Sequence, residues 1–458
     1  MPRPRPTTER ATARAAAFAV GLGAFAQASR AWAGSPKLQG VGETSVGYTD
    51  NAQSAPDVPL PGTTPRSPGA FVLLRPGIVL GAASPRFAQR LKYTYTYDLL
   101  LASTDASTSS NQLEYQGFFD LSPRMQMVLG GVAVQSNENS AIVLTPPGAG
   151  SVNALPPGSG SFLSAAVNEL VSFDLASRWR ANEAAAFAEQ TPLFDTVAPR
   201  TFVPSLRADL ERSFDAGTIG PEARAEYSAV QGSLAPDGTA LGLQQQVIVA
   251  GLALWRRDWG QFLTSRAEVG AMRVQRLTTG RGFWGPAGGV SLAYVPATGD
   301  AELSYDHRAT TNLFLGETLL VDEVRLRGAL PLPGARDFVA SASVGYQYAK
   351  ILDENAQPAA HVGVLLADAG LGWELAPTVL LGLRYQHITQ ASDTRVPPLP
   401  LSFVRNTVLL GATFRFPPDR EMPPVYRAPL RVDRTDEIRT PAHLPEGATP
   451  GESSGPGP

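Results

Sequence analysis

The chain has no cysteine and only four histidines among its 458 residues. The lack of cysteine excludes a disulfide scaffold, a thiolate metal site, a cysteine nucleophile and a cysteine-linked lipid anchor. The histidines (307, 361, 387 and 443) are dispersed and form no cluster suited to a metal or a catalytic triad. We therefore predict no cofactor, no metal site and no catalytic residues, and we expect the protein not to be an enzyme.

Long apolar runs are also missing after residue 33, because none reaches the ~18–20 residues that a membrane-spanning helix needs. With 44 glycines and 40 prolines, the chain is poorly suited to long helices. Before that point, residues 3–14 carry four arginines, residues 15–26 are apolar, and Ala31-Trp32-Ala33 fits a small-x-small cleavage pattern. Residues 1–33 are predicted to be a signal peptide that directs export.

Without residues 1–33, the chain retains 33 Lys and Arg against 40 Asp and Glu. A mild acidic excess disfavours nucleic acid as a partner. It does not by itself indicate a substrate.

Polar and apolar side chains alternate along much of the remaining sequence. In residues 90–98, Leu91, Tyr93, Tyr95 and Tyr97 alternate with polar or charged residues. A strand has a side-chain period of two, so this pattern predicts a β-strand with one apolar and one polar face. A soluble β-sandwich would show the same alternation, and the pattern alone does not choose between the two classes.

The connections between strands favour a barrel over a sandwich. The connections that follow even-numbered strands are tight, whereas those that follow odd-numbered strands are longer and mostly rich in Gly, Pro, Ser, Asn and Asp. Short turns at one end and long loops at the other are typical of outer-membrane barrels. We predict an all-β transmembrane antiparallel barrel over residues 34–416. The expected strands are 38–49, 68–81, 86–100, 111–121, 124–135, 161–175, 178–188, 201–213, 219–229, 241–256, 260–276, 285–296, 299–309, 318–330, 337–350, 359–375, 377–390 and 403–416.

A barrel of this size faces lipid with one set of alternating residues and its lumen with the other. The charged set predicts a wetted channel rather than a packed interior. The predicted lumen residues are Arg90, Lys92, Arg207, Asp209, Glu211, Arg224, Glu226, Arg266, Glu268, Glu302, Asp306, Glu323, Arg325, Arg327 and Arg384. The tryptophans at 179, 255, 259 and 373 fall near the short turns, which predicts an interfacial aromatic belt there. The longest loop, 136–160, either folds inward as a constriction or stands outside as a flap.

The last strand ends in Gly411-Ala412-Thr413-Phe414-Arg415-Phe416. This segment resembles the terminal signal read by the outer-membrane insertion machinery, and the match covers Gly411, Phe414 and Phe416. It departs from that signal at Leu409, where a polar residue is usual. It also departs in position, because the signal normally ends the chain and here residues 417–458 follow it. The Pro-rich residues 417–458 cannot bury enough apolar surface to fold, and we predict a disordered periplasmic tail.

In architecture and terminal motif, residues 34–416 resemble an outer-membrane β-barrel of porin type. More narrowly, the opening segment from Gly47 to Asn51 is similar to the first strand of barrels associated with Wzx/Wzy-type exopolysaccharide export. That resemblance implies a Gram-negative outer-membrane channel that passes polysaccharide together with a periplasmic polysaccharide-export protein. Two alternatives remain open at this point: a diffusion porin for small solutes, and a structural or adhesive barrel.

Overall fold

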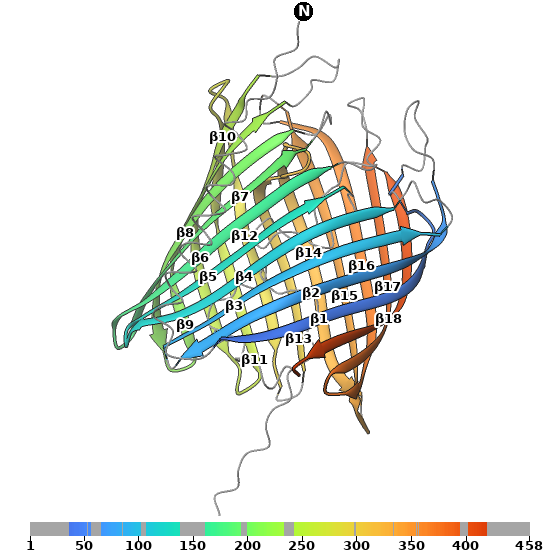
Figure 1. Cartoon of the computed structure of the whole chain (residues 1–458). Coiled ribbons are helices and arrows are strands. Elements are labelled where there is room, and N and C mark those ends of the chain that lie inside the picture. The colour runs from blue at the N-terminus through green and yellow to red at the C-terminus, as the bar shows by residue number, and fades with distance from the viewer. Residues whose placement is uncertain are drawn as a thin grey trace, which may run out of the picture.

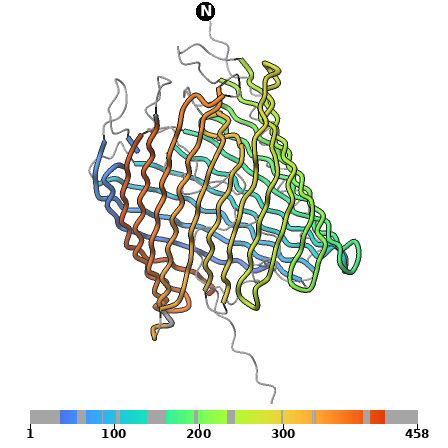
Figure 2. Tube along the Cα trace, turned by 180° about the vertical axis from the view of Figure 1, so that it is seen from behind, coloured from blue at the N-terminus to red at the C-terminus, as the bar shows by residue number. Residues whose placement is uncertain are grey.

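The described residues of the computed structural model form a closed barrel of eighteen antiparallel strands (Figure 1, Figure 2). The described ranges are 36–52, 54–55, 66–84, 86–101, 107–137, 161–193, 199–232, 242–296, 299–332, 334–353, 355, 357–393 and 402–418. Within these ranges, no helix is long and apolar enough to cross a membrane. The predicted all-β barrel class and the number of strands are confirmed.

The strands follow one another along the chain with few long interruptions. They are β1 (Lys37–Thr49), β2 (Gly69–Ser84), β3 (Phe87–Leu100), β4 (Thr108–Ser122), β5 (Met125–Ser136), β6 (Phe162–Ala176), β7 (Trp179–Pro192), β8 (Arg200–Phe214), β9 (Gly217–Gln231), β10 (Gln244–Asp258), β11 (Leu263–Arg276), β12 (Gly282–Tyr294), β13 (Asp300–Thr311), β14 (Thr318–Leu332), β15 (Ala335–Leu352), β16 (Pro358–Ala376), β17 (Val379–Asp393) and β18 (Phe403–Phe416). The predicted boundaries agree to within a few residues. The largest difference is at β7, where residues 189–192 continue the strand because all four pair with β6 and the first two also pair with β8.

Each strand pairs with its neighbours in sequence, and β1 pairs with β18 to close the sheet. This closing seam runs from Gly40↔Phe416 to Thr49↔Thr407. At its lower end the Gln39 side chain donates a hydrogen bond to the Pro417 carbonyl, 2.7 Å away. Closure leaves no sheet edge at this seam, as a barrel in lipid requires.

The two ends of the barrel differ as predicted. Turns between even- and odd-numbered strands, such as 123–124 and 177–178, are short, and we call this the short-turn end. The opposite, long-loop end carries connections such as 50–68 and 137–161. Two connections at the long-loop end, 277–281 and 312–317, are shorter than the eight-residue gaps predicted there, because β12 begins earlier and β13 ends later than expected.

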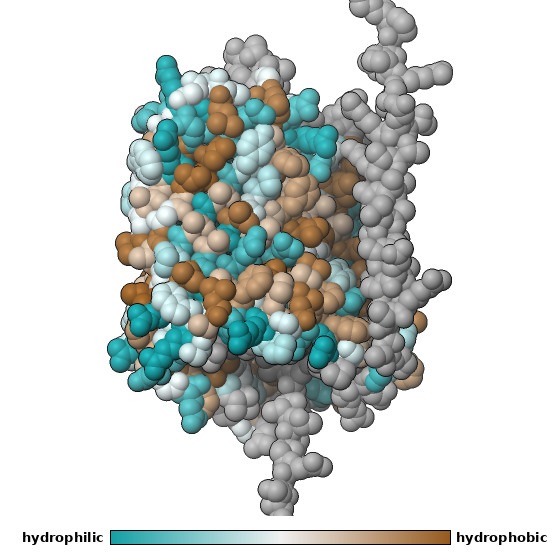
Figure 3. Space-filling model, turned by 90° about the vertical axis from the view of Figure 1, so that its left-hand side faces the viewer, coloured by the Kyte–Doolittle hydropathy of each residue, from teal (hydrophilic) through white to brown (hydrophobic). Residues whose placement is uncertain are grey.

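Successive side chains alternate between the inside and the outside of the barrel. On β3, Thr94 is 4% exposed, whereas Tyr95 is 36% exposed. On β9, the Glu226 carboxylate contacts Thr311 of β13, four strands away, and only a side chain on the inner face can make this contact. Apolar residues are abundant on the outer face, and Figure 3 shows them over the middle of one side, with hydrophilic residues towards both the upper and the lower rim.

Several predictions concern residues outside the described ranges. These are the signal peptide at 1–33, the disordered tail from residue 419 onward, and residues 138–160 of the longest loop. They remain predictions from the sequence.

Candidate functional site: the barrel interior

The most extensive group of paired charges inside the barrel lies on β8, β9 and β11. At its centre is Glu222, whose side chain is fully buried. One of its oxygens lies 3.0 Å from Nη2 of Arg207 and 3.2 Å from Nη2 of Arg266, and its other oxygen pairs with Arg224. Arg266 also reaches Glu268 at 2.7 Å. Because each carboxylate is shared between guanidinium groups from different strands, the cluster links three strands of the wall.

Further ion pairs continue around the inner face. They are Lys92–Glu114 at 3.2 Å, Arg75–Glu43 at 2.8 Å, Arg180–Asp174 at 2.7 Å, Arg325–Glu323 at 2.9 Å, Arg384–Asp368 at 2.6 Å, and Arg327–Glu302. Arg308 lies 3.5 Å from both Asp306 and Glu323. The inner wall is therefore lined by charges of both signs that neutralise one another locally.

The predicted lumen residues thus fall into several separate groups. Arg207, Asp209, Arg224, Arg266 and Glu268 come together around Glu222, which was not among the predicted residues although it precedes Arg224 by two positions. Glu302 and Arg327 form one pair, while Asp306, Glu323 and Arg325 belong to a group completed by Arg308. Glu211 is 7% exposed on β8, and Arg90 is half-buried on β3.

Sequence alternation assigns the faces of these strands but not the partners of the charges. Arg224 and Glu268, for example, are 44 residues apart and meet only because β9 and β11 flank β10. Removing one member of such a buried group leaves an unpaired charge, which typically costs ~3–5 kcal/mol.

A short turn at the long-loop end lies inside the barrel rather than above it. This inward turn comprises residues 312–317 between β13 and β14. Asn312, Leu313 and Phe314 are at most 3% exposed, and the Phe314 ring meets the Phe162 ring of β6 edge-on at 5.6 Å. The surrounding apolar cluster consists of Val132, Val134, Phe162, Ala166, Ala188, Val203, Leu313 and Phe314.

The inward turn spans the barrel from one wall to the other. While Phe314 packs on β6, Leu315 packs against Val362 and Val364 of β16. In a closed barrel of eighteen strands, β6 and β16 are nearly opposite each other. The turn therefore crosses the lumen at the long-loop end.

Local hydrogen bonds shape the inward turn. The Asn312 side-chain oxygen accepts from the backbone N–H groups of Phe314 and Leu315, both at 2.9 Å. The Gly316 N–H donates to the Asn312 carbonyl at 2.8 Å. Gly316 has a φ of 68°, and a Cβ there would lie 2.6 Å from Val230, so both the backbone and the packing require glycine.

The residues that flank the inward turn, Thr311 and Thr318, are bound by side chains of β9 and β10. The Glu226 Oε1 atom accepts from the Thr311 N–H at 2.9 Å and from its hydroxyl at 2.8 Å. Gln246 donates to the Thr311 hydroxyl at 2.8 Å and accepts a hydrogen bond from Thr318. Glu226, predicted as a lumen charge, thus anchors the turn.

The sequence prediction assigned a possible constriction to loop 136–160 and overlooked this turn. Its signal is the run Leu313-Phe314-Leu315, three large apolar residues in a connection that would otherwise be solvated. Such a run needs a partner to bury it, and a turn has none unless it folds onto the barrel wall.

The histidines of the described strands lie on the outer face and apart from one another. His307 Nδ1 is 2.7 Å from Asp322, His361 stacks on Tyr348, and His387 Nδ1 is 2.7 Å from Asn406. Within the described ranges, no group of three or more His, Asp or Glu residues is arranged to hold a metal ion.

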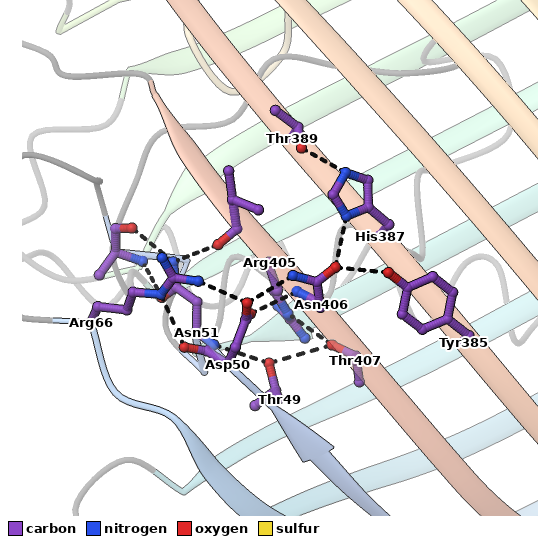
Figure 4. A network of polar contacts seen from close by, with 12 residues as sticks. Thr49, Asp50, Asn51, Arg66, Tyr385, His387, Thr389, Arg405, Asn406 and Thr407 are labelled. Carbon is purple, nitrogen blue, oxygen red and sulfur yellow. Dashed lines mark hydrogen bonds and ion pairs between the residues drawn. The ribbon is translucent and has the colours of Figure 1, made fainter.

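A polar network joins β1, β17 and β18 where the barrel closes at the long-loop end (Figure 4). Asp50 accepts hydrogen bonds from the Asn406 backbone and side chain, and from Arg66, all at 2.7 Å. Burial raises the pKa of Asp50, but the Asn406 hydrogen bonds and the Arg66 charge outweigh it and hold that pKa below its usual value. Asn51 is fully buried and donates to the Val404 carbonyl at 3.0 Å. The opening motif from Gly47 to Asn51 therefore helps to close the barrel.

Aromatic side chains mark both rims of the outer face. Trp179, Trp255, Trp259 and Trp373 are 37–49% exposed near the short turns. Arginines lie over two of them, with Arg257 4.2 Å from the Trp259 ring and Arg212 5.6 Å from the Trp179 ring. Near the long-loop end, Tyr48 at the end of β1 and Trp284 at the start of β12 are 54% and 68% exposed on the outer face. Such belts are typical of the two interfaces of a membrane.

The chain matches no protein-family model and no curated protein sequence. Among solved structures, it is similar to the FrpB iron transporter of Neisseria meningitidis (8% identity, 84% of this chain and 82% of that chain, TM-score 0.44). It is also similar to the siderophore receptor PirA of Pseudomonas aeruginosa (8% identity, 83% and 80%, TM-score 0.41). A third similar structure is OccK9 (OpdG) of Pseudomonas aeruginosa (10% identity, 83% and 98%, TM-score 0.41). These similarities are of the barrel fold.

Proposed function

We propose that this protein is an outer-membrane channel through which hydrophilic solutes pass. The observation that carries the proposal is the contrast between the two faces of the closed sheet. The outer face presents apolar side chains between two aromatic rims, whereas the inner face carries the ion pairs around Glu222 and along the other strands. A β-sheet satisfies all its backbone groups in lipid only when it closes into a barrel, and its alternating side chains then keep the charges on the inner face, away from the hydrocarbon.

The paired charges also indicate how solutes move. A wall whose charges neutralise one another has a weak net field, so it offers many weak polar contacts rather than one tight binding site. Conduction requires this kind of binding, because a solute held tightly at one place does not leave. We expect little selectivity for the sign of small ions.

The inward turn favours small solutes. Because it crosses from β6 to β16, it divides the cross-section at the long-loop end, which is the extracellular end in this proposal. A small molecule passes on either side of the turn, whereas a polymer has to displace it.

Polysaccharide export is the second candidate function. Its support is the opening motif from Gly47 to Asn51 and a wall of locally neutralised charges, along which a long polar chain slides without a tight site. In this case the partners are a periplasmic polysaccharide-export protein and the polymer itself. The inward turn then has to swing aside during export.

Planar-bilayer recordings test the channel directly. The purified protein should give discrete conductance steps, and replacing Leu313-Phe314-Leu315 by Gly-Ser-Gly should increase the step size because the crossing segment no longer packs on either wall. Glu226→Ala should increase the noise of the open-channel current, since it removes the acceptor that holds Thr311 at the start of the turn. Glu226→Gln should preserve part of this contact. A protein that inserts but never conducts would instead be a structural or adhesive barrel.

A deletion strain separates the two candidate functions. Loss of the protein should slow uptake of small hydrophilic solutes while surface polysaccharides stay intact. If one surface polysaccharide disappears while its intracellular precursors are still made, export replaces diffusion as the function.

The proposed location is tested by fractionation. The mature protein should begin at Gly34 and sediment with the outer membrane, after the barrel-insertion machinery has assembled it there. A soluble periplasmic pool or a retained Met1 would contradict the proposed export and insertion.

A further inference from the structure

Among the eighteen seams of the described barrel, the β12–β13 seam has the shortest ladder. β12 and β13 pair over seven positions, from Tyr294↔Ala301 to Gly288↔His307. The neighbouring seams continue to the long-loop end, with β11–β12 reaching Gln275↔Gly282 and β13–β14 reaching Thr311↔Thr318. Residues 282–287 and 308–311 therefore face a seam without ladder pairs between them.

The chemistry of the next position explains where the ladder stops. In the same register, Pro286 would face Ala309, and proline has no amide hydrogen to donate. The Ala309 N–H donates instead to the Met272 sulfur of β11 at 3.2 Å. The Thr311 N–H donates to the Glu226 carboxylate. Two backbone donors on the upper part of β13 are thus satisfied by side chains of other strands.

Apolar packing closes this upper seam from the inside. The cluster consists of Ile248, Leu252, Met272, Val274, Ala287, Ala309 and Leu352, with Phe283 and Leu320 packed against it. Each of these seven residues is at most 8% exposed. An apolar lining contrasts with the charged inner wall lower on β8, β9 and β11. Two members of this apolar cluster, Ala287 and Ala309, belong to the two strands that border the seam.

The outer side of the same seam is also marked by an aromatic residue. Trp284 of β12 is 68% exposed, and the Arg273 guanidinium lies 5.5 Å from its ring centre. Below it, His307 ends the paired part of the seam and contacts Asp322 at 2.7 Å. A solute leaving through the seam would meet an indole and polar groups at the level of the membrane interface.

We propose that the upper β12–β13 seam is a lateral passage that lets an apolar or amphipathic solute move between the barrel interior and the outer leaflet. Separating two paired strands in lipid leaves backbone groups without hydrogen-bond partners, which strongly disfavours opening. Here the Ala309 and Thr311 donors are bound by side chains from across the seam, so opening disrupts apolar packing and these two contacts rather than a continuous backbone ladder. The inference rests on the proposed channel, because the solute has to reach the interior cluster first.

Reversible cross-linking tests the passage. Because the chain has no natural cysteine, the introduced pair supplies all of its thiols. Ala287→Cys with Ala309→Cys is bridged by a short bifunctional thiol reagent that reductant cleaves. The matched control is Ser291→Cys with Ser304→Cys, which are register partners in the paired part of the same seam. The readout is influx of the apolar dye N-phenylnaphthylamine into intact cells.

Bridging the upper pair should lower dye influx to the rate of cells without the protein, and reduction should restore it. Bridging the lower pair should leave influx unchanged. Met272→Leu, which keeps the volume but removes the acceptor of the Ala309 N–H, should speed influx. Complete bridging of the upper pair without loss of influx, or equal loss from both bridges, overturns the proposal.

Ion conductance of the same bridged proteins in planar bilayers distinguishes this inference from the proposed function. Conductance that survives upper bridging while dye influx is lost supports both. Absent conductance in the unbridged protein refutes the channel, whereas unchanged dye influx after upper bridging refutes the lateral passage alone. Heat-modifiable gel mobility verifies that each variant is folded.

Discussion

At the scale of single residues, the closing seam depends on a close approach of β1 and β18 that leaves no space for a side chain at Gly411. Gly411 of β18 faces Ser45 of β1, and a Cβ at Gly411 would lie 2.1 Å from the Ser45 hydroxyl and 2.9 Å from the Thr44 carbonyl oxygen. The glycine of the terminal motif is therefore required by the approach of two strands. This structural role stands beside the predicted role in insertion.

Gly411→Ala should lower the stability of the assembled barrel because the added methyl group forces β1 and β18 apart. Ser45→Gly in the same chain should restore much of the loss, since it removes the atoms that the methyl group meets first. The temperature at which gel mobility changes from the folded to the unfolded form measures both effects. An equal loss in the single and double variants would indicate that the glycine serves insertion alone.

Asp50 provides a pH-dependent contribution to the same seam. Its pKa is held below the usual value, so the charged form stabilises the folded state at neutral pH. That contribution is complete above the unfolded pKa of about 4 and is lost as the pH falls through the lower, folded value.

The unfolding temperature of the natural protein should fall between pH 7 and strongly acidic pH. In Asp50→Asn it should fall by less over the same range. The effect should be modest because the carboxylate is partly exposed and screened by solvent. Asp120→Asn, at the opposite end of the barrel, serves as the control. Identical pH profiles for all three proteins would mean that the network around Asn406 does not depend on this charge.

At the scale of elements, β18 is the strand on which closure depends, because it pairs with both β17 and β1. Its last residue, Phe416, is 77% exposed on the outer face and pairs with Gly40. The described residues beyond Phe416, Pro417 and Pro418, add no strand pairs. The strand and the tail should therefore differ sharply in their importance for assembly.

Phe416→Ala should reduce the amount of assembled barrel far more than removal of residues 420–458. Leu410→Ala, also on the outer face of β18 and 58% exposed, is the matched control for a general loss of apolar surface. Heat-modifiable gel mobility of outer-membrane fractions reports assembly. If removal of the tail is the more damaging change, the terminal motif is not the signal that directs insertion.

At the scale of the whole molecule, the proposal of a channel predicts opposite effects for substitutions on the two faces of one strand. Val344 lies near the middle of β15 on the outer face and is 44% exposed, whereas the adjacent Ser343 faces inward and is paired in register with Asp368. Val344→Arg should destabilise the barrel by ~2–4 kcal/mol, the typical cost of arginine at the bilayer midplane.

Ser343→Arg should be tolerated, because the added charge enters a polar interior next to a carboxylate. Equilibrium unfolding of the protein from lipid vesicles by denaturant measures both variants. The reverse order of the two effects would mean that the outer face of this barrel is not in contact with lipid.

The sequence alone determined the local properties of this protein. Alternation along segments such as 90–98 depends only on the two-residue period of a strand, so it predicted the strands, their number and the two faces. The parity of the connections predicted closure into a barrel, because short and long connections sort to opposite ends. β18 occupies the residues expected for it, 403–416.

Only the tertiary structure decided which residues meet across the barrel. Glu226 and Thr311 are 85 residues apart, and their contact depends on the closure of the barrel and on the inward turn that follows β13. The same is true of the charges shared around Glu222 and of Phe314 on β6. Pro286 is visible in the sequence, but its effect on the β12–β13 seam depends on the register that brings Ala309 opposite it. Periodicity is a property of one strand, whereas contacts between distant strands depend on how the whole sheet closes.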